Sequence, residues 1–514
     1  MPIKIPANGD ARVQVTVVES TDLSLSPNHL LLTPTFRLVL SVCRYLGYQG
    51  DAFIPLQIFN AFFGAASIIL FLGLLRNLKV TASWSLIGSF LMAYTYGYWL
   101  HSREVESSII PQFFMILSLW LLSCLSREKN NIKTLMVTIA GGISAAASVL
   151  YAMNYILILP AFSVFIYALG LKQYRLRPLA IFVVIFSISI LIPYILGAKS
   201  ALDTLNPKEC LEWVSHHHLE KKIPGARQIS AMNALRATSG LINTFVGDTS
   251  VTTAVKQILK GREMIYIPLS DWLRFFIGVL LIILLFIPLL YRPWSEIQRA
   301  IFLVTTVAFV FVGMFNIFWQ GRDPQFWLPL IPFILMLTCT AAPKTISFRK
   351  YLVMWIIPAL LLLLNMPYPV PTLWNPEAKG SPDWQKAQIY ARMANPKDLL
   401  ICSSGEWAGY IKAFGDFPSL SLIYSVEAKG ERYKENLHKI IDQTLREKGK
   451  VYALGIFGKL PPDFIGAWEE IETVSDLSRP DLIKDLTSRY EVMLIYPDVF
   501  GDTLWQIKTQ STSN

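Results

Sequence analysis

The sequence predicts an all-α polytopic membrane bundle of about ten transmembrane helices, followed by a small α/β soluble C-terminal domain. Three observations predict this fold class. Of the 514 residues, 53% are hydrophobic and 16% are charged, whereas about a quarter of the residues in a soluble protein are charged. Long apolar runs alternate with short polar connectors up to Leu364, and an ordinary soluble composition follows. The basic residues before Leu364 fall mainly in the short connectors, as membrane orientation requires.

A helix needs about 20 apolar residues to cross the hydrocarbon core of a bilayer. Ten apolar runs come close to this length, and each is expected to be a membrane-spanning helix. They are Ile54–Leu75, Trp84–Leu100, Ile109–Leu125, Leu135–Met153, Tyr155–Leu171, Leu179–Leu196, Trp272–Tyr291, Ala300–Trp319, Gln325–Thr340 and Tyr351–Leu364. The predicted transmembrane domain is 54–370, and 199–271 is the long loop inside it.

Lysine and arginine in the short loops set the orientation of a polytopic protein. Thirteen basic residues fall in one set of alternating loops, whereas only Arg103 and Arg322 fall in the opposite short loops. The first set is therefore expected to be cytoplasmic. The other side, which we expect to be the outer face of a bacterial inner membrane, then holds residues 1–53, the loop 199–271 and the soluble domain 371–514.

The N-terminal segment 1–53 would have to cross the membrane although no apolar span precedes it. Either a short tail is translocated unaided, or a first transmembrane helix is missing from this sequence, and we expect the second. Within the segment, 30–48 is apolar but interrupted by Pro34, Arg37 and Arg44, which is typical of an interfacial helix. This juxtamembrane helix is either a packing element or a platform that holds an arginine near a lipid phosphate.

Composition also bounds the partners and cofactors. A formal net charge of +10 is common in nucleic-acid-binding proteins, but here the position of the basic residues explains it, so no nucleic-acid partner is expected. The five cysteines show no CxxC or Cys/His metal spacing, which argues against a disulfide framework. Three consecutive histidines, His216–His218, cannot all face one metal ion. No metal-ligand set is expected, and a divalent cation is the one cofactor left open.

The short connector His101–Glu106 holds four ionisable residues among six. Charge beside lipid is costly unless it is paired or hydrated, so Arg103, Glu104 and Glu106 are candidate site residues. The alternative is a solvated turn with a pair between Arg103 and a glutamate.

A third connector runs from Trp319 to Trp327. Asp323 precedes a proline at the expected start of a helix, where it suits an N-cap with Arg322 as its partner. Alternatively, Arg322 is a fixed cation for a phosphate oxygen, a role that suits the planar guanidinium.

The order of these features resembles the GT-C superfamily of integral membrane glycosyltransferases, including the protein O-mannosyltransferases and bacterial enzymes that use polyprenyl-phosphate sugars. That family has an acidic outer loop, a segment with proline and histidine, a juxtamembrane helix, a helical hairpin and a second acidic loop. This sequence offers Asp10, then Pro27 and His29, and later the connector Ser102–Glu106. The resemblance covers about residues 5–370 and departs from the family in lacking the first helix and a paired Asp-Glu.

The resemblance implies a donor sugar on a polyprenyl phosphate, membrane lipids as partners, and an acceptor hydroxyl on an unknown protein, lipid or glycan. It implies Asp10 as the general base, with Glu104 and Glu106 as further catalytic acids. The substrate-binding residues that it implies are His29, Arg103, Arg322 and Asp323. The competing hypotheses are a transporter or flippase of a lipid-linked or small polar substrate, and a non-catalytic lipid-binding membrane protein.

The soluble domain is expected to contain four strands: Asp398–Cys402, Leu420–Tyr424, Val451–Phe457 and Glu491–Tyr496. Helical patterns lie between them, which favours a partly parallel sheet. Ser403, Ser404 and Glu406 lack an evident histidine partner, so a substrate-recognition or structural role is expected.

Overall fold

The computed structural model describes residues 14–15, 18–19, 26–50, 52–126, 131–169, 176–202, 206–215, 231–247, 269–286, 294–318, 321, 323–342, 348–365, 395, 397–403, 419–422, 433–458, 468, 471, 477–497 and 503–510. The chain divides into two compact units. The first contains Thr21–Val214 and Ala226–Trp374, and the second contains Asn375–Asn514 with two short segments, 3–20 and 215–225.

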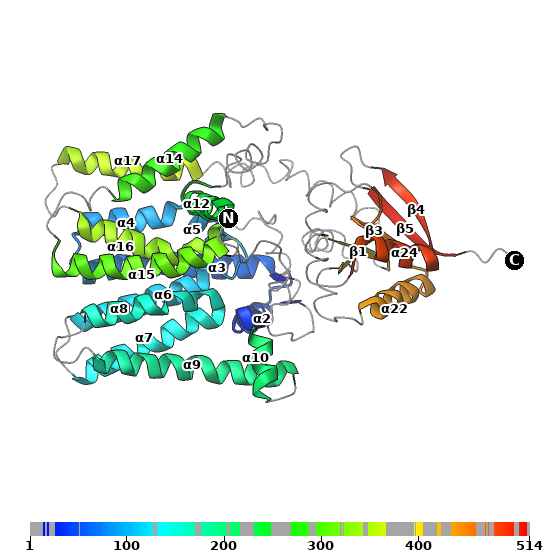
Figure 1. Cartoon of the computed structure of the whole chain (residues 1–514), viewed down its shortest axis with the longest axis horizontal. Coiled ribbons are helices and arrows are strands. Elements are labelled where there is room, and N and C mark those ends of the chain that lie inside the picture. Colours follow the sequence, from blue (N-terminus) through cyan, green and yellow to red (C-terminus); the bar gives the residue numbers. More distant parts are fainter. Residues whose placement is uncertain are drawn as a thin grey trace. The chain divides into compact units, whose positions relative to one another are not determined.

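The first unit is a bundle of helices (Figure 1). Its helices are η1 Pro27–His29, α2 Leu32–Tyr45, α3 Phe53–Asn77, α4 Ala82–Tyr94, α5 Tyr96–Arg103, α6 Ile109–Ser123, η2 Cys124–Ser126, α7 Asn131–Tyr151, η3 Met153–Ile158, α8 Leu159–Leu169, α9 Leu176–Leu202, α10 Pro207–Ser215, α12 Ala231–Val246, α14 Leu269–Phe286, α15 Glu296–Phe318, η5 Pro324–Leu330, α16 Ile331–Ala341 and α17 Phe348–Asn365. Each predicted span coincides with one of these helices or with two consecutive ones.

Five helical stretches within the described residues are long and apolar enough to cross a bilayer unaided. They are Phe53–Asn77, Asn131–Tyr151, Leu176–Ser200, Glu296–Phe318 and Pro324–Ala341. Four shorter apolar helices accompany them: Ile109–Ser123, Met153–Leu169, Trp272–Leu285 and Trp355–Asn365. Shorter spans are tolerated where neighbouring helices cover the backbone. The bundle is that of a multi-pass membrane protein, as predicted.

The predicted span Trp84–Leu100 is interrupted in the structure. Thr95 has an extended backbone (φ −62°, ψ 136°), and its hydroxyl donates a hydrogen bond to the carbonyl of Met92 (2.9 Å). Threonine side chains compete in this way for helical backbone groups. Helix α4 therefore ends at Tyr94, and the short helix α5 turns away to carry Trp99, His101 and Arg103.

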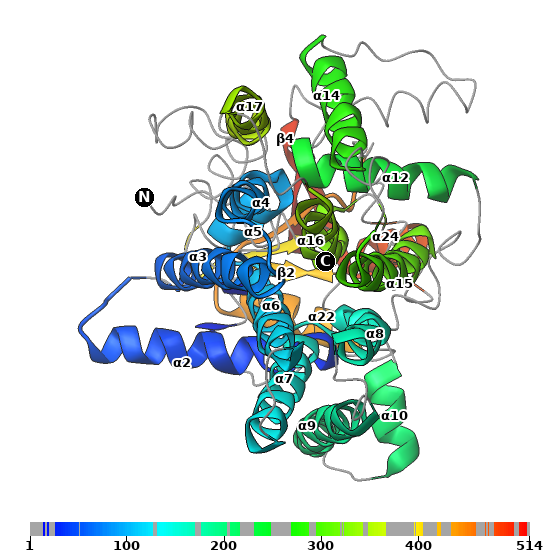
Figure 2. The ribbon, with the colours of Figure 1, turned by 90° about the vertical axis from the view of Figure 1, so that its left-hand side faces the viewer.

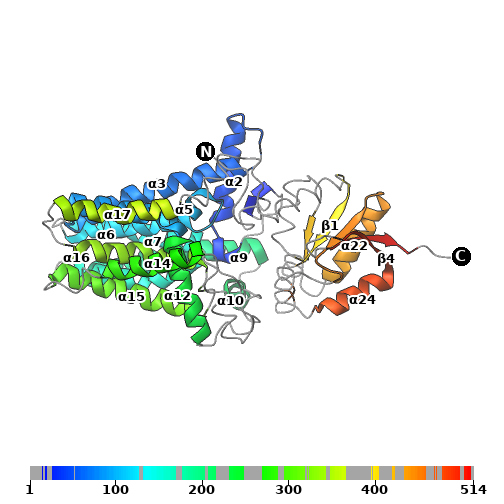
Figure 3. The ribbon, with the colours of Figure 1, turned by 90° about the horizontal axis from the view of Figure 1, so that it is seen from above.

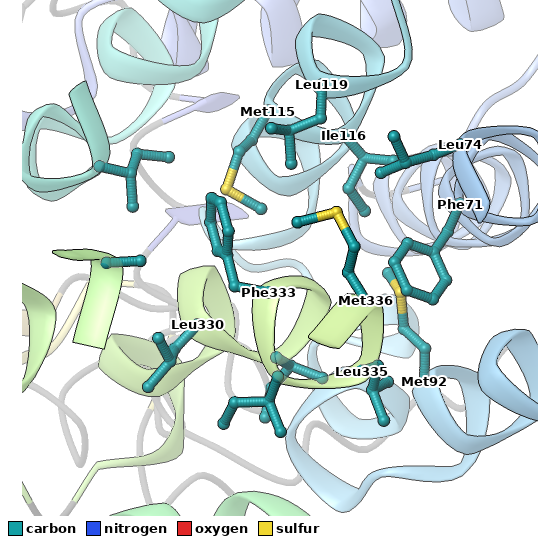
Figure 4. Close-up of a cluster of buried hydrophobic side chains, with 14 of the residues drawn as sticks. Phe71, Leu74, Met92, Met115, Ile116, Leu119, Leu330, Phe333, Leu335 and Met336 are labelled. Carbon is teal, nitrogen blue, oxygen red and sulfur yellow. The ribbon is translucent and has the colours of Figure 1, made fainter. Parts of the chain in front are cut away.

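Helix α16 is the centre of the bundle. Figure 4 shows Phe333 and Met336 of α16 packed among Met115 and Ile116 of α6 and Phe71 of α3. These side chains are fully buried. Because protein interiors are close-packed, this contact fixes α16, and with it η5 at its start, against the helices that carry the acidic connector.

Two helices, α2 and α12, run across the direction of the bundle helices (Figure 2), at the same end as α5 (Figure 3). The first confirms the helix predicted within 30–48. Phe36 and Leu40 of α2 are buried, whereas Leu38 and Val42 are 65% and 50% exposed. The second lies inside the segment 199–271, which is thus not a simple loop: α12 packs on α5, η5 and α14.

The second unit contains a five-stranded sheet with strand order β2-β1-β3-β5-β4. The strands are β1 Leu399–Cys402, β2 Ser419–Ser421, β3 Val451–Leu454, β4 Tyr490–Pro497 and β5 Thr503–Thr509, with helices α22 Tyr433–Arg446 and α24 Arg479–Arg489. The pairs β1–β2 and β1–β3 are parallel, and the pairs β3–β5 and β4–β5 are antiparallel. The partly parallel sheet is as predicted, although the sequence analysis missed β5.

A polar chain joins the described helices α22 and α24 to β4. His438 of α22 lies 2.7 Å from Asp485 of α24 and 3.2 Å from the hydroxyl of Tyr490. That hydroxyl donates to Asp442 (2.8 Å). These bonds fix the helices on the sheet. Ser403 is buried, and Ser404 and Glu406 lie outside the described residues.

Candidate active site

The candidate site is built on residues 104–108, which we call the acidic connector, between the end of α5 and the start of α6. Asn60 of α3 donates from one amide nitrogen to the carbonyls of Glu104 (2.7 Å) and Glu106 (2.9 Å). Asn60 is fully buried, so these bonds lie in a low-dielectric interior where they are strong. Gly64, one helical turn further along α3, lets Ser102 of α5 pack directly against the helix.

Both connector glutamates are buried: Glu104 is 1% exposed and Glu106 is 4% exposed. The alternative of a solvated turn is therefore wrong. The ion pair that this alternative expected is nevertheless present, because Arg103 Nη2 lies 3.5 Å from Glu104 Oε1. Buried carboxylates are costly without partners, so this connector is a specialised feature and not a simple spacer.

Arg103 is the cation of the site. Its side chain is 21% exposed, and its Nε and Nη1 atoms are buried with no hydrogen-bond partner in the described part of the chain. Burial lowers the pKa of Arg103, and the neighbouring Glu104 raises it. An arginine with only part of its donor fork used is suited to accept an anion, since the remaining N–H groups match two oxygens of a phosphate.

The structure brings Asp323, in the third connector, close to the acidic connector. Asp323 caps η5 by accepting from the backbone N–H of Gln325 (3.0 Å) and from its side-chain amide (2.9 Å). The side-chain oxygen Oε1 of Gln325 accepts from the hydroxyl of Ser108 at 3.5 Å. The N-cap reading of Asp323 is thus confirmed, and its substrate-binding role stays a prediction. Arg322 lies outside the described residues.

A second link runs through residues that the sequence analysis missed. Gln112 of α6 donates to the carbonyl of Leu328 in η5 (3.1 Å). The Tyr155 hydroxyl lies 3.0 Å from the side-chain oxygen Oε1 of Gln112 and 3.1 Å from the backbone carbonyl of Ser108. Asn60 and Gln112 were visible in the sequence as amides inside apolar runs. Such residues face a bundle interior, and this signal would have found them.

His101 was also missed as a candidate. It is 3% exposed, and neither ring nitrogen has a hydrogen-bond partner among the described residues. Burial lowers its pKa to about 4, so the ring is neutral at pH 7. Gly97, one turn earlier on α5, faces Thr244 of α12 and Pro324 of η5. Residues four apart share a helix face, which puts His101 on the side of α5 that faces these elements.

The neutral state of His101 predicts a pH effect on stability. A histidine whose folded pKa lies below its unfolded value of 6.5 loses stability as the pH falls from about 6.5 to 4, because only the unfolded chain takes up the proton. The variant H101Q is expected to have a shallower fall of melting temperature over this range. Thermal unfolding of purified wild type and H101Q at several pH values measures the difference, and parallel curves would contradict it.

His29 has an anchoring role in the structure. Its Nδ1 donates to the carbonyl of Tyr151 at the end of α7 (2.9 Å), and burial lowers its pKa. The described contacts do not join His29 to the acidic connector. Asp10 lies outside the described residues, so its place in the site stays a prediction.

The described residues do not fit a metal ion. No group of three or more histidine, cysteine, aspartate or glutamate side chains among them is placed to hold one. Glu104 is paired with Arg103, whose positive charge disfavours a second cation at that carboxylate. We therefore assign no step to a divalent cation.

The architecture defines the fold. A multi-pass helical bundle with a buried acidic connector at one end, two crosswise helices at that end and a small C-terminal α/β unit has the fold of the ArnT structures. No family model and no curated protein matches the chain.

Two solved structures with this fold are of ArnT from Cupriavidus metallidurans. The form bound to undecaprenyl phosphate has a TM-score of 0.54 at 12% identity, covering 98% of this chain and 94% of that one. The apo form has a TM-score of 0.57 at 11% identity, covering 98% and 93%. An Archaeoglobus fulgidus oligosaccharyltransferase complex with Zn and sulfate reaches 0.47 at 13% identity, covering 98% and 69%. The ArnT similarity establishes the fold that the sequence predicted.

Proposed function

We propose that the protein is a membrane glycosyltransferase that moves a sugar from a polyprenyl-phosphate carrier to an acceptor hydroxyl at the non-cytoplasmic face. The observation that carries the proposal is the acidic connector, where the buried Glu104 pairs with Arg103, whose Nε and Nη1 are buried and unused among the described residues, and where a second buried glutamate, Glu106, follows two residues on. The fold supports it, because an ArnT structure with the same fold holds undecaprenyl phosphate. A polyprenyl-phosphate donor lies in the bilayer, so membrane lipids around the bundle are further proposed partners.

The proposed reaction is a displacement at the anomeric carbon of the sugar. The acceptor hydroxyl loses its proton to a carboxylate as its oxygen bonds to that carbon, and the bond from the carbon to the phosphate oxygen breaks. The electron pair leaves with the lipid phosphate. The guanidinium of Arg103 stabilises the resulting negative charge, and its partly buried position makes this electrostatic effect stronger than in water.

The remaining roles are assigned to three carboxylates and a second arginine. Asp10 is our candidate general base. Glu104 holds Arg103 in position, since the two form the ion pair at 3.5 Å. Glu106 orients the acceptor. Arg322 is proposed as a second cation for the phosphate. The face of the membrane is assigned from the distribution of basic residues between the loops.

Binding of undecaprenyl phosphate to the purified full chain in detergent tests the proposal. The variant R103Q is expected to bind it at least about tenfold more weakly, because a charge-assisted hydrogen bond to phosphate is lost. The matched control is R236Q on α12, since Arg236 is exposed and, among the described residues, bonds to Asn233 on its own helix. Equal affinity of wild type, R103Q and R236Q would contradict the role of Arg103.

A further inference from the structure

The polar chain of the second unit consists of four ionisable side chains joined by three hydrogen bonds. His438 Nε2 lies 2.7 Å from Asp485 Oδ2, and His438 Nδ1 lies 3.2 Å from the Tyr490 hydroxyl. That hydroxyl lies 2.8 Å from Asp442 Oδ1. All three distances are those of hydrogen bonds. His438 and Tyr490 are 6% and 5% exposed, so water has little access to the two central groups.

The polar chain needs more hydrogens than its groups carry in their ordinary states at neutral pH. Each of the three bonds needs one hydrogen between its two heavy atoms, so the polar chain needs three. The carboxylates of Asp442 and Asp485 only accept, the phenol of Tyr490 supplies one hydrogen, and a neutral imidazole supplies one. These states provide two hydrogens for three bonds. Two acceptor lone pairs would then face each other at hydrogen-bonding distance.

The third hydrogen belongs on the ring of His438. Burial raises the pKa of Tyr490, and the hydrogen bond to Asp442 raises it further, so the phenol keeps its proton and donates it to Asp442. The phenol oxygen then accepts from His438 Nδ1, while Nε2 donates to Asp485. Imidazole is a stronger base than a carboxylate, so the ring takes the extra proton. A histidine that donates from both nitrogens is a cation.

The charged groups around His438 favour this cation. Asp442 lies four residues further along α22, and Asp485 faces the ring from α24. Arg489 of α24 opposes the cation, but its side chain is 58% exposed and its Nε lies 3.9 Å from the other oxygen of Asp485. Tyr490 of β4 is uncharged, and β3, which also packs on α22, has no charged residue. Two aspartates against one exposed arginine stabilise a positive ring.

We propose that the polar chain is a pH-sensitive switch, in which His438 carries a proton on both ring nitrogens and loss of one of them weakens the attachment of α22 and α24 to β4. A histidine in the opened unit is mostly neutral above about pH 6.5. The closed unit then holds one proton more than the opened one. Its stability is therefore full below about pH 6.5 and falls as the pH rises. The inference is independent of the proposed function, since it uses the second unit alone.

Hydrogen exchange of the full chain in detergent tests the switch, read by mass spectrometry in peptides from α22 and α24. We expect the opening equilibrium of these helices to rise about tenfold between pH 7 and pH 8, after correction for the intrinsic exchange rate, because one bound proton changes an equilibrium tenfold per pH unit. The variant D442N should abolish this rise. Its amide donates to Tyr490, Tyr490 donates to a neutral His438, and His438 donates to Asp485, so all three bonds form without an extra proton.

Two further variants make the result specific. The variant D485N supplies the third hydrogen from the other end of the polar chain and should also abolish the rise. The matched control is D481N, because Asp481 is exposed in the first turn of α24 and bonds to Ser478, outside the polar chain. This control should keep the rise of wild type.

The outcomes decide the inference. A rise in wild type and D481N that is absent from D442N or D485N supports the switch. Equal opening of wild type at pH 7 and pH 8 overturns it, as does an equal rise in all four proteins. Protection of α22 and α24 at pH 6 shows which variants are folded. If neither D442N nor D485N is protected there, the wild-type result alone decides.

Discussion

The variant E104Q is expected to lower sugar transfer by about 10²-fold, because it removes the buried charge that positions Arg103 and because small misplacements of a catalytic group have effects of this size. Glutamine keeps the shape of the side chain. The backbone bonds from Asn60 to the connector do not depend on the carboxylate. The measurement is the movement of radiolabelled sugar out of the lipid fraction in membranes that contain the protein.

Two controls make the E104Q result specific. The first is E296Q, because Glu296 is exposed in the first turn of α15 and has no place in the proposed site. The second is thermal unfolding, in which E104Q should melt close to wild type, since glutamine keeps the shape of the side chain. Full transfer activity in E104Q would show that the connector is structural. Loss of activity together with a much lower melting temperature would indicate that the variant disturbs the fold.

The variant G240A is expected to destabilise the bundle severely. Gly240 of α12 packs against the backbone of Gly321, and an added Cβ would overlap the Gly321 carbonyl oxygen and lie 2.8 Å from Trp327 Nε1. That carbonyl also accepts the Trp327 N–H at 2.8 Å. Relieving this overlap would require the backbone of Gly240 or Gly321 to move. Forcing a methyl group into a packed interior costs about 1–3 kcal/mol, and more where backbone must move.

The same overlap predicts a functional effect. Pushing Gly321 away from α12 moves the connector that leads into η5, including the Asp323 cap and its link through Gln325 to Ser108. Thermal unfolding should therefore show a lower melting temperature, with reduced binding of undecaprenyl phosphate. The matched control is G313A within α15, where the nearest atoms to an added Cβ lie at 3.6 and 3.7 Å. That variant is expected to be neutral or slightly stabilised, because alanine favours helices. Equal stability of G240A and G313A would contradict the packing argument.

The sequence was sufficient to predict the bundle because apolar runs of membrane length are a strong local signal. The division of Trp84–Leu100 into α4 and α5 was missed, because a single residue, Thr95, interrupts the helix. Helix α12 was missed because its pattern is amphipathic and lies in a long polar segment. Strand β5 was missed because polar and apolar residues alternate only weakly along Thr503–Thr509.

The candidate site was predicted in part. The charged connector pointed to Arg103, Glu104 and Glu106 because ionisable groups beside lipid are rare; the structure pairs Arg103 with Glu104 and buries both glutamates. The amides that hold the connector lie on other helices. Asn60 and Gln112 gain their roles only when α3, α6 and η5 meet, which depends on tertiary packing around α16. Asp323 was identified correctly as a cap, whereas His29 anchors the chain end of α7 and does not reach the connector in the described contacts.

The central claim is that the guanidinium of Arg103 holds the phosphate of a polyprenyl carrier. An experimental structure of the full chain with undecaprenyl phosphate tests it most directly. We predict a phosphate oxygen within about 3 Å of Arg103 Nε or Nη1, with the isoprenoid tail running into the bilayer. A phosphate bound at the opposite end of the bundle, or one held at the α5 end without contact to Arg103, would contradict the account.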